Sequence, residues 1–102
     1  MKILAVTACP SGVAHTYMAA EALKNACAAE HIECKVETQG SIGVESAITA
    51  EDLTDATAVV LTNDMPIKDV ERFADLPKIK LPAATVIKSA PAIVAKVKSE
   101  LG

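Results

Sequence analysis

The stretch that decides the fold is AVTACPSGVAHTYMAAEAL, residues 5–23, where an apolar run ends in a cysteine and an alanine-rich pattern follows. Residues 2–8 (KILAVTA) are typical of a buried β-strand, and residues 15–31 show the apolar spacing of a helix. Cys9 therefore lies at a predicted strand–helix junction.

Strand-like and helix-like segments continue to alternate along the chain. We expect strands at residues 2–8, 33–39, 57–64 and 78–81, and helices at residues 15–31, 49–56, 67–74 and from Pro91 onwards. This alternation predicts an α/β fold, a three-layer α/β/α sandwich with a four-stranded parallel sheet. The length of 102 residues predicts one domain, residues 1–102.

The polarity of the strands predicts their order in the sheet. ILAV in the first strand and AVVL in the third are continuously apolar, as in strands covered on both faces, whereas CKVE and KIKL alternate, as in edge strands. The predicted order is 2-1-3-4. In such sheets ligands bind at the carboxyl ends of the strands where the order reverses, which is the position of the loop that carries Cys9.

Composition excludes several functions. The net charge is −3, only two residues are aromatic and no basic stripe is present, so nucleic acid is not an expected partner. No apolar run is long enough to span a membrane, and the N-terminal run is too short for a signal peptide. We therefore expect a cytoplasmic protein without membrane insertion.

The other cysteines predict neither disulfides nor a metal site. The chain has three cysteines, an odd number, and no two of them form a CxxC pair, which argues against a disulfide framework. Cys27, His31 and Cys34 are close in sequence but lack a fourth ligand, so we expect no metal and no cofactor. Cys27 and Cys34 are interpreted as inert.

The loop after the first strand has the properties of an anion site. Unpaired backbone N–H groups and the helix dipole converge at the start of a helix, and Gly12 with the small residues Ser11 and Ala14 leaves room for a phosphate. The same field stabilises a thiolate, so Cys9 is a candidate nucleophile for a phosphoryl group. The alternative is that Cys9 is a small buried apolar residue at a strand end.

Neighbouring polar residues have open roles. The hydroxyls of Thr7 and Ser11 could hydrogen bond to the thiolate. His15 could act as an acid or base, donate to a phosphate, or cap the helix as a neutral imidazole.

Two further loops end at the same edge of the sheet. Gln39, Gly40 and Ser41 follow the second strand and Asp64 follows the third, so they could line the pocket, contact a partner or serve as turn residues. Because a carboxylate would repel a transferred phosphate, we favour a structural role for Asp64.

Four blocks of sequence resemble a known family. CPSGVAHTYMAAEAL (9–23), VETQGSIG (36–43), TND (62–64) and RF (72–73) are similar in order and spacing to the fructose-type enzyme IIB component of the bacterial phosphoenolpyruvate-dependent sugar phosphotransferase system (PTS). The chain departs from the common family pattern at Ser11, where Thr is usual, and at Ser46, where Asn is expected.

The resemblance implies a phosphotransferase that works through a phosphocysteine. Cys9 would accept a phosphoryl group from a phosphohistidine of the IIA protein and pass it to fructose or a fructose-like sugar bound by the membrane IIC component. The implied phosphate-binding loop comprises Pro10, Ser11, Gly12, Val13, Ala14, His15 and Thr16. The family fold is likewise a four-stranded parallel sheet flanked by helices.

Three other classes use some of the same features. Low-molecular-weight phosphotyrosine phosphatases and arsenate reductases carry Cys-x-x-x-x-x-Arg, but His15 stands at the arginine position here, and Asp64 is the only candidate acid. A redox thiol would need a resolving cysteine near Cys9. A regulatory module that only binds a phosphoprotein would need no nucleophile.

Overall fold

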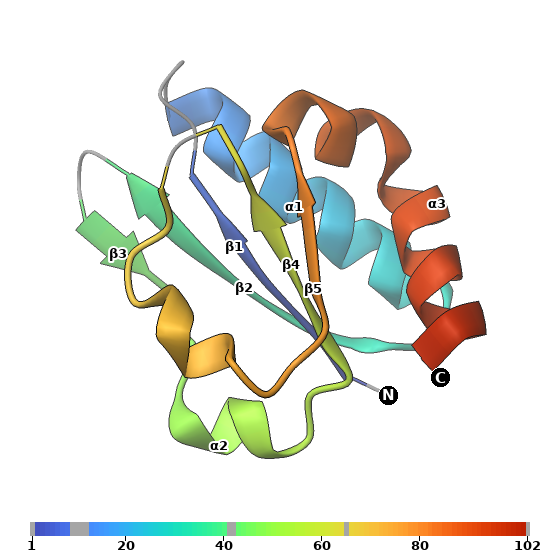
Figure 1. Ribbon diagram of the computed structural model, residues 1–102. Helices are drawn as coiled ribbons and strands as arrows, with labels where there is room; N and C mark the ends of the chain where they lie inside the picture. Colours follow the sequence, from blue (N-terminus) through green and yellow to red (C-terminus); the bar gives the residue numbers. More distant parts are fainter. Residues whose placement is uncertain (1, 9–12, 41–42, 65, 102) are drawn as a thin grey trace.

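The computed structural model of the chain describes residues 2–8, 13–40, 43–64 and 66–101. Figure 1 shows a single sheet with helices packed against it. The strands are β1 (Lys2–Thr7), β2 (Glu33–Gly40), β3 (Gly43–Glu45), β4 (Ala58–Thr62) and β5 (Lys78–Leu81), and the helices are α1 (Val13–Ala29), α2 (Ala50–Thr54), the 3-10 helix η1 (Val70–Phe73) and α3 (Ala83–Leu101).

The sheet has the order β3-β2-β1-β4-β5. Strands β2, β1, β4 and β5 lie side by side in this order and are parallel to one another, which confirms the predicted order of the four parallel strands. The prediction of a four-stranded, all-parallel sheet is wrong, because β3 pairs with β2 in the antiparallel direction. The strand at residues 33–39 is therefore not at an edge. Since all three residues of β3 are exposed, no apolar run marks it in the sequence.

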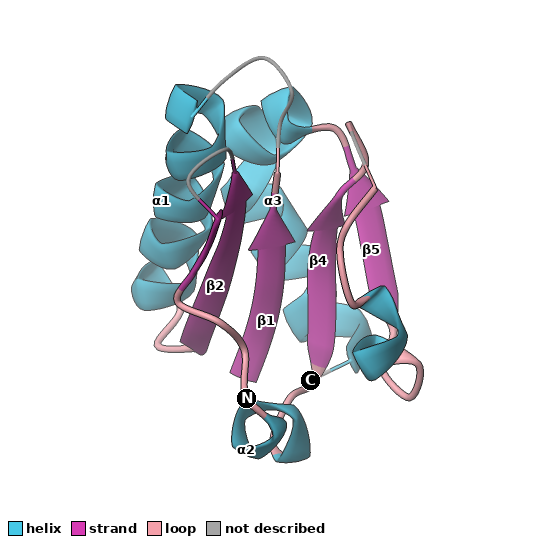
Figure 2. Cartoon of the chain, turned by 90° about the vertical axis from the view of Figure 1, so that its left-hand side faces the viewer, coloured by secondary structure: helices cyan, strands magenta, loops and turns pink. Residues whose placement is uncertain are grey.

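Both faces of the sheet are covered, as predicted (Figure 2). Alternate residues of β1 point to opposite sides, so Ile3 and Ala5 pack in the core beneath α1 and α3, whereas Leu4 and Val6 pack with Phe73 on the other face. This double coverage explains why β1 reads as a continuous apolar run.

Helix α3 begins earlier than predicted. The expected start at Pro91 is wrong, because the helix runs from Ala83 and contains Pro91, with a break in helical geometry at Ser89 (φ −121°, ψ 20°). The carbonyl of Pro82 accepts a hydrogen bond from Val86 N (3.0 Å), as in a first helical turn. Proline lacks the N–H that would continue the ladder, so the helix kinks rather than ends.

The helices of the other face are short. Helix α2 is confirmed, and a capping box between Thr49 and Asp52 marks its start. The segment predicted as a helix at residues 67–74 contains only the 3-10 helix η1, preceded by Asp69 in the left-handed conformation. The described residues thus form three α-helices and one 3-10 helix, not four α-helices. None of the helices in this part of the chain is long and apolar enough to cross a membrane.

Candidate functional site

The predicted site lies at the edge of the sheet where β1 ends and α1 begins. Strand β1 ends at Thr7, and the first turn of α1 starts at Val13, so only a short loop separates them. Several predicted site residues lie outside the described residues. They are Cys9, Pro10, Ser11 and Gly12 of this loop and Ser41 of the neighbouring loop. Val13, Ala14, His15 and Thr16 form the first turn of α1.

The first turn of α1 offers backbone donors and no negative charge. None of its residues is acidic, so no side-chain carboxylate of the turn offsets the positive end of the helix dipole. Its leading N–H groups have no partner within the helix. This end of α1 therefore retains the character of an anion site.

The hydroxyl of Thr7 ties the end of β1 to this turn. It donates a hydrogen bond to the backbone carbonyl of Thr16 across 3.1 Å, and both residues are buried. The sequence left open whether the Thr7 hydroxyl bonds to the thiolate; in the structure this hydroxyl donates its hydrogen to Thr16 instead.

A second hydroxyl, that of Thr62 at the end of β4, holds the backbone of Ala8. It accepts from Ala8 N at 2.9 Å and donates to the Ala8 carbonyl at 3.0 Å. The paired register of β1 and β4 ends at Val6 and Leu61, so the side chain extends the connection beyond the backbone ladder. No role was predicted for Thr62 from the sequence, although Thr62 is the first residue of the TND block (62–64).

Gln39 is buried and turned toward the segment before η1. Its carboxamide donates to the Lys68 carbonyl (3.1 Å) and accepts from Lys68 N (2.9 Å), so both backbone groups of Lys68 are bound. It also donates to the carboxylate of Glu37 at 2.8 Å. Gln39 therefore joins β2 to the 66–69 segment, and Gly40 ends β2 opposite Gly43.

A buried ion pair that the sequence did not reveal lies behind Gln39. The guanidinium of Arg72 binds both carboxylate oxygens of Glu37, at 2.8 and 2.6 Å, and Ile48 N donates to Glu37 at 2.9 Å. Glu37 is 1% exposed, and Arg72 also stacks on the ring of Phe73. Burial alone would raise the pKa of Glu37, but the bonds from Arg72, Gln39 and Ile48 outweigh it and hold that pKa below its usual range.

Asp64 has the structural role expected of it. Its carboxylate accepts a hydrogen bond from Ala83 N at 2.6 Å and so caps the start of α3. This contact joins the end of β4 to the helix that follows β5.

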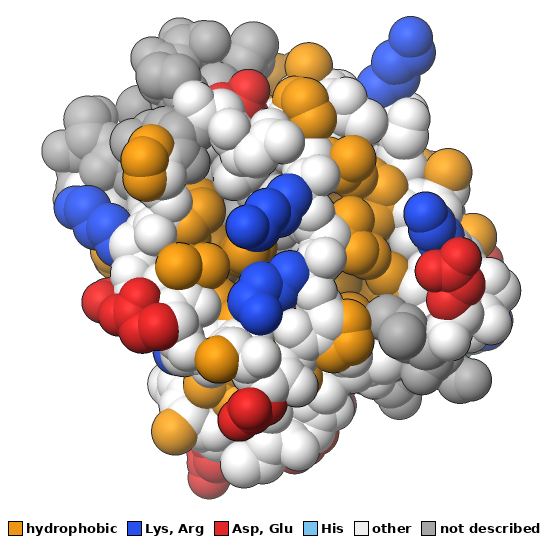
Figure 3. All heavy atoms as spheres, in the orientation of Figure 1, with side chains coloured by type: hydrophobic (Ala, Val, Ile, Leu, Met, Phe, Trp, Pro, Cys, Tyr) orange, Lys and Arg blue, Asp and Glu red, His pale blue; other side chains and the backbone are white. Residues whose placement is uncertain are grey.

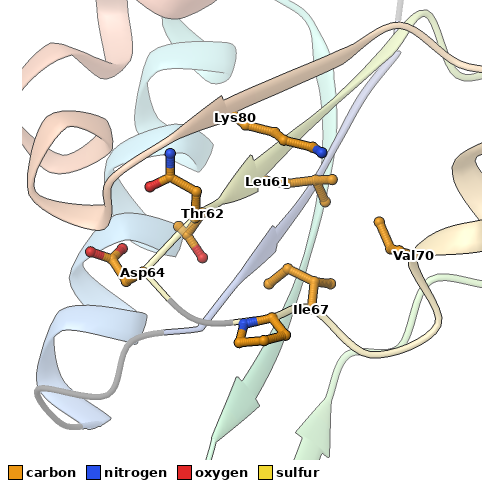
Figure 4. A pocket seen from close by; sticks show the side chains of 8 residues that line it. Leu61, Thr62, Asp64, Ile67, Val70 and Lys80 are labelled. Carbon is orange, nitrogen blue, oxygen red and sulfur yellow. The ribbon is translucent and has the colours of Figure 1, made fainter.

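A cleft of about 460 Å³ opens beside the end of β4 (Figure 4). Its floor is apolar, and Lys80 of β5 lies beside Leu61, its register partner. Figure 3 shows basic side chains among apolar groups on the face that it draws. The lining residues are Leu61, Thr62, Asn63, Asp64, Pro66, Ile67, Val70 and Lys80.

The remaining candidate ligands do not form a metal site. Among the described residues, no three His, Cys, Asp or Glu side chains are grouped to hold a metal ion. The thiols of Cys27 and Cys34 hydrogen bond to each other, and that bond, together with burial, raises the pKa of Cys34 far above its usual range. Cys34 thus lacks the thiolate character of a reactive site, whereas the same hydrogen bond lowers the pKa of the buried Cys27.

Comparison with known proteins identifies the family. The family described as "PTS system, Lactose/Cellobiose specific IIB subunit" matches residues 4–96. The chain belongs to the IIB family of the sugar phosphotransferase system. It is 55% identical over 100 residues to the PTS system fructose-like EIIB component 2 of Escherichia coli strain K12, which covers 98% of this chain and 94% of that protein.

Two further similarities extend this result. The chain is 39% identical over 99 residues to the PTS system fructose-specific EIIABC component of Bacillus subtilis strain 168, covering 97% of this chain and 15% of that protein. A crystallised domain of the fructose-specific IIABC component of Borrelia burgdorferi matches with a TM-score of 0.88 and 41% identity, over 96% of this chain and 93% of that domain. The resemblance seen in the sequence is confirmed, and the activity class is that of a PTS phosphotransferase.

Proposed function

We propose that this IIB chain carries a phosphoryl group on Cys9 between a IIA protein and a sugar bound by the membrane IIC component. The thiolate of Cys9 attacks the phosphorus of a IIA phosphohistidine, forming the S–P bond as the P–N bond breaks, and the imidazole takes up a proton. A sugar hydroxyl then attacks the same phosphorus, forming an O–P bond as the S–P bond breaks; the thiolate leaves and the hydroxyl proton passes to solvent or to a base. The observation that carries the proposal is the position of Cys9 in the sequence between the end of β1 and the start of α1, in a chain 55% identical to a IIB component.

The geometry of the described residues supports a phosphate-binding site where β1 ends and α1 begins. The first turn of α1 has backbone donors without a partner within the helix and has no acidic side chain, which suits the phosphoryl oxygens. We assign the phosphate-binding loop to residues 10–16, with Gln39, Gly40 and Ser41 at its rim. Gly12 belongs to this loop, and a residue without a side chain would allow the backbone to approach a phosphate closely.

The phosphatase alternative receives less support. Asp64, its only candidate acid, is engaged at the start of α3. His15 replaces the arginine that would clamp a phosphate through two parallel hydrogen bonds. The lack of that arginine suits a carrier, whose phosphocysteine must survive until the sugar arrives.

The names of the relatives support IIA and IIC as partners, whereas the identity of the sugar requires an experiment. The EIIABC component of Bacillus subtilis combines IIA, IIB and IIC in its name, which supports IIA and IIC as partners of this chain. We propose that residues 1–102 act as one IIB domain in the cytoplasm. We propose fructose or a fructose-like sugar, because the E. coli and B. subtilis relatives carry fructose in their names.

Intact-mass measurement tests the carrier step. The chain is incubated with the phosphorylated IIA protein of the same transport system, beside a Cys9→Ser variant. We expect one phosphoryl adduct on the wild type, mapped to Cys9, and none on the variant. An adduct of equal yield on both proteins, or none on either, contradicts the proposal, and repeated turnover of p-nitrophenyl phosphate favours the phosphatase.

A second experiment tests the sugar. Membrane vesicles that contain the IIC component are supplied with the phosphorylated IIB chain and with fructose, lactose or cellobiose in turn. We expect loss of the phosphoryl group from Cys9 and formation of sugar phosphate with fructose or a close analogue. Discharge by lactose or cellobiose alone would assign the sugar named in the family description instead.

A further inference from the structure

Two buried hydroxyls hold the backbone on either side of the loop that carries Cys9. Thr7 binds the first turn of α1 through the carbonyl of Thr16, and Thr62 binds both backbone groups of Ala8. The side chains of Thr7 and Thr62 are almost fully buried, with 1% and 2% exposure. Neither bond is therefore open to competition from bulk water.

We propose that Thr7 and Thr62 are positioning residues for phosphoryl transfer. Together they fix the end of β1 that precedes Cys9 against both α1 and β4. This inference rests on the proposed carrier function and adds to it two residues that act through the backbone, without contact with the phosphate.

Thr7 joins the strand that precedes Cys9 to the helix that carries the anion site. Its hydroxyl reaches across nine positions of sequence to Thr16, so it joins the last residue of β1 to the first turn of α1. The nucleophile follows one of these elements, and the backbone donors for the phosphoryl oxygens belong to the other. If the hydroxyl is lost, the helix end and the strand end can move relative to each other.

Thr62 fixes the residue immediately before Cys9. Ala8 is fully buried, and the β1–β4 register stops two residues before it, at Val6. One hydroxyl satisfies both the N–H and the carbonyl of Ala8, since it is donor and acceptor at once. A valine at this position would fill the same space and leave both groups without this partner.

A positioning role predicts an effect on rate that goes beyond any loss of stability. In-line transfer requires the sulfur and the phosphorus to approach within narrow limits, and a misplacement of about 1 Å can cost about 100-fold in rate. Because neither hydroxyl lies on the surface that meets IIA, the affinity for IIA should not change. The expected signature is a lower kcat with an unchanged KM for phosphorylated IIA.

The experiment compares hydroxyl-free and hydroxyl-retaining variants by quenched-flow mass spectrometry with the phosphorylated IIA protein of the same system. We expect Thr7→Val and Thr62→Val to lower kcat about 10- to 100-fold, and Thr7→Ser and Thr62→Ser to retain most of the wild-type rate. Thr54→Val is the matched control, because the Thr54 hydroxyl also donates to a backbone carbonyl, that of Glu51, but in α2 at the opposite end of the sheet (Figure 1).

The outcomes separate this inference from the function on which it rests. A wild-type chain without a phosphoryl adduct overturns the proposed function. A wild-type adduct with unchanged kcat in both folded valine variants overturns only the positioning role, as does an equal loss in Thr54→Val. Circular dichroism at the assay temperature verifies folding, and if a valine variant fails to fold, the corresponding alanine variant is measured against the same criteria.

Discussion

The two faces of the sheet are covered by different means. On one face, α1 and α3 span 17 and 19 residues and contribute a mainly aliphatic core that includes Leu23, Val86 and Val94. On the other face, α2 has five residues and η1 has four, and Phe73 supplies the largest buried side chain. The second face therefore has far less helix with which to exclude water.

Hydrogen bonds supplement the apolar packing of the short-helix face. Glu37 and Gln39 of β2 bind three separate points of the covering chain, namely Ile48, Lys68 and Arg72. Short segments bury too little apolar surface to fix their own position, whereas a charged and hydrogen-bonded network specifies one arrangement. The same network positions the chain that borders the cleft beside Thr62.

The largest expected effect comes from breaking this network at Arg72. Replacing Arg72 by Ala leaves the Glu37 carboxylate buried without its charged partner, which typically costs about 3–5 kcal/mol. We expect a corresponding loss in the free energy of unfolding, measured by urea denaturation with circular dichroism detection.

A double variant tests whether the loss of stability in Arg72→Ala is caused by the unpaired Glu37 carboxylate. The pair is not perfectly satisfied, since Arg72 Nε is buried without a hydrogen-bond partner in the described part of the chain. We therefore expect Glu37→Leu/Arg72→Met to recover most of the stability lost in Arg72→Ala. A double variant as unstable as Arg72→Ala would show that the pair itself, and not the unpaired carboxylate, accounts for the stability.

On the long-helix face the vulnerable groups are aliphatic. Leu23 is fully buried between α1 and the sheet, and its truncation to Ala should destabilise the fold by about 2–5 kcal/mol through lost burial and the cavity left behind. Urea denaturation of Leu23→Ala at pH 5 and pH 7 should give the same loss at both values. A loss that depends on pH would contradict a purely apolar role.

The short-helix face should instead respond to pH. The folded-state pKa of Glu37 lies below its ordinary value of 4.5, so the unfolded chain binds a proton at Glu37 before the folded chain does. The stability contributed by the ion pair is therefore fully present above the ordinary value and is lost as the pH falls through the folded-state pKa. The difference in unfolding free energy between wild type and Glu37→Gln should shrink over that range, and a constant difference would contradict the assignment.

The order of the parallel strands could be predicted from the sequence, whereas the edge strand could not. Continuous apolar runs place β1 and β4 at the centre because they are buried on both faces. Strand β3 has no such pattern: its three residues are exposed, and it begins at Gly43, which has a positive φ of 106° and pairs with Gly40. The start of α3 was missed because Pro82 and Pro91 suggested irregular chain, although a proline is tolerated before a first turn and at a kink.

In the candidate site, too, one part could be predicted from the sequence and another part could not. The junction at Cys9 is local in sequence, so the strand, the small residues and the helix could be recognised together. The supporting contacts join distant positions: Thr62 is 54 residues from Ala8, and Arg72 is 35 residues from Glu37. No local pattern marks such pairs, because they depend on which strands become neighbours.

A smaller effect is expected at the start of α2 on the short-helix face. Thr49 caps the helix by accepting from Asp52 N, and the Asp52 carboxylate accepts from Thr49 N in return. Replacing Thr49 by Ala should lower the free energy of unfolding by about 0.5–2 kcal/mol. Urea denaturation measures the loss, Thr49→Ser should restore most of the stability, and equal losses in both variants would argue against a cap.

The smallest effect is expected from an ion pair beside the long helices. Lys98 of α3 binds Glu30 at 2.9 Å, but the two side chains are 53% and 42% exposed, so water and salt screen their attraction. We expect Lys98→Ala to leave the urea midpoint within experimental error of the wild type. Arg72→Ala, measured under the same conditions, removes a cation from a similar pair whose carboxylate is buried. If Lys98→Ala were as destabilising as Arg72→Ala, burial of the carboxylate could not explain the difference between the two faces.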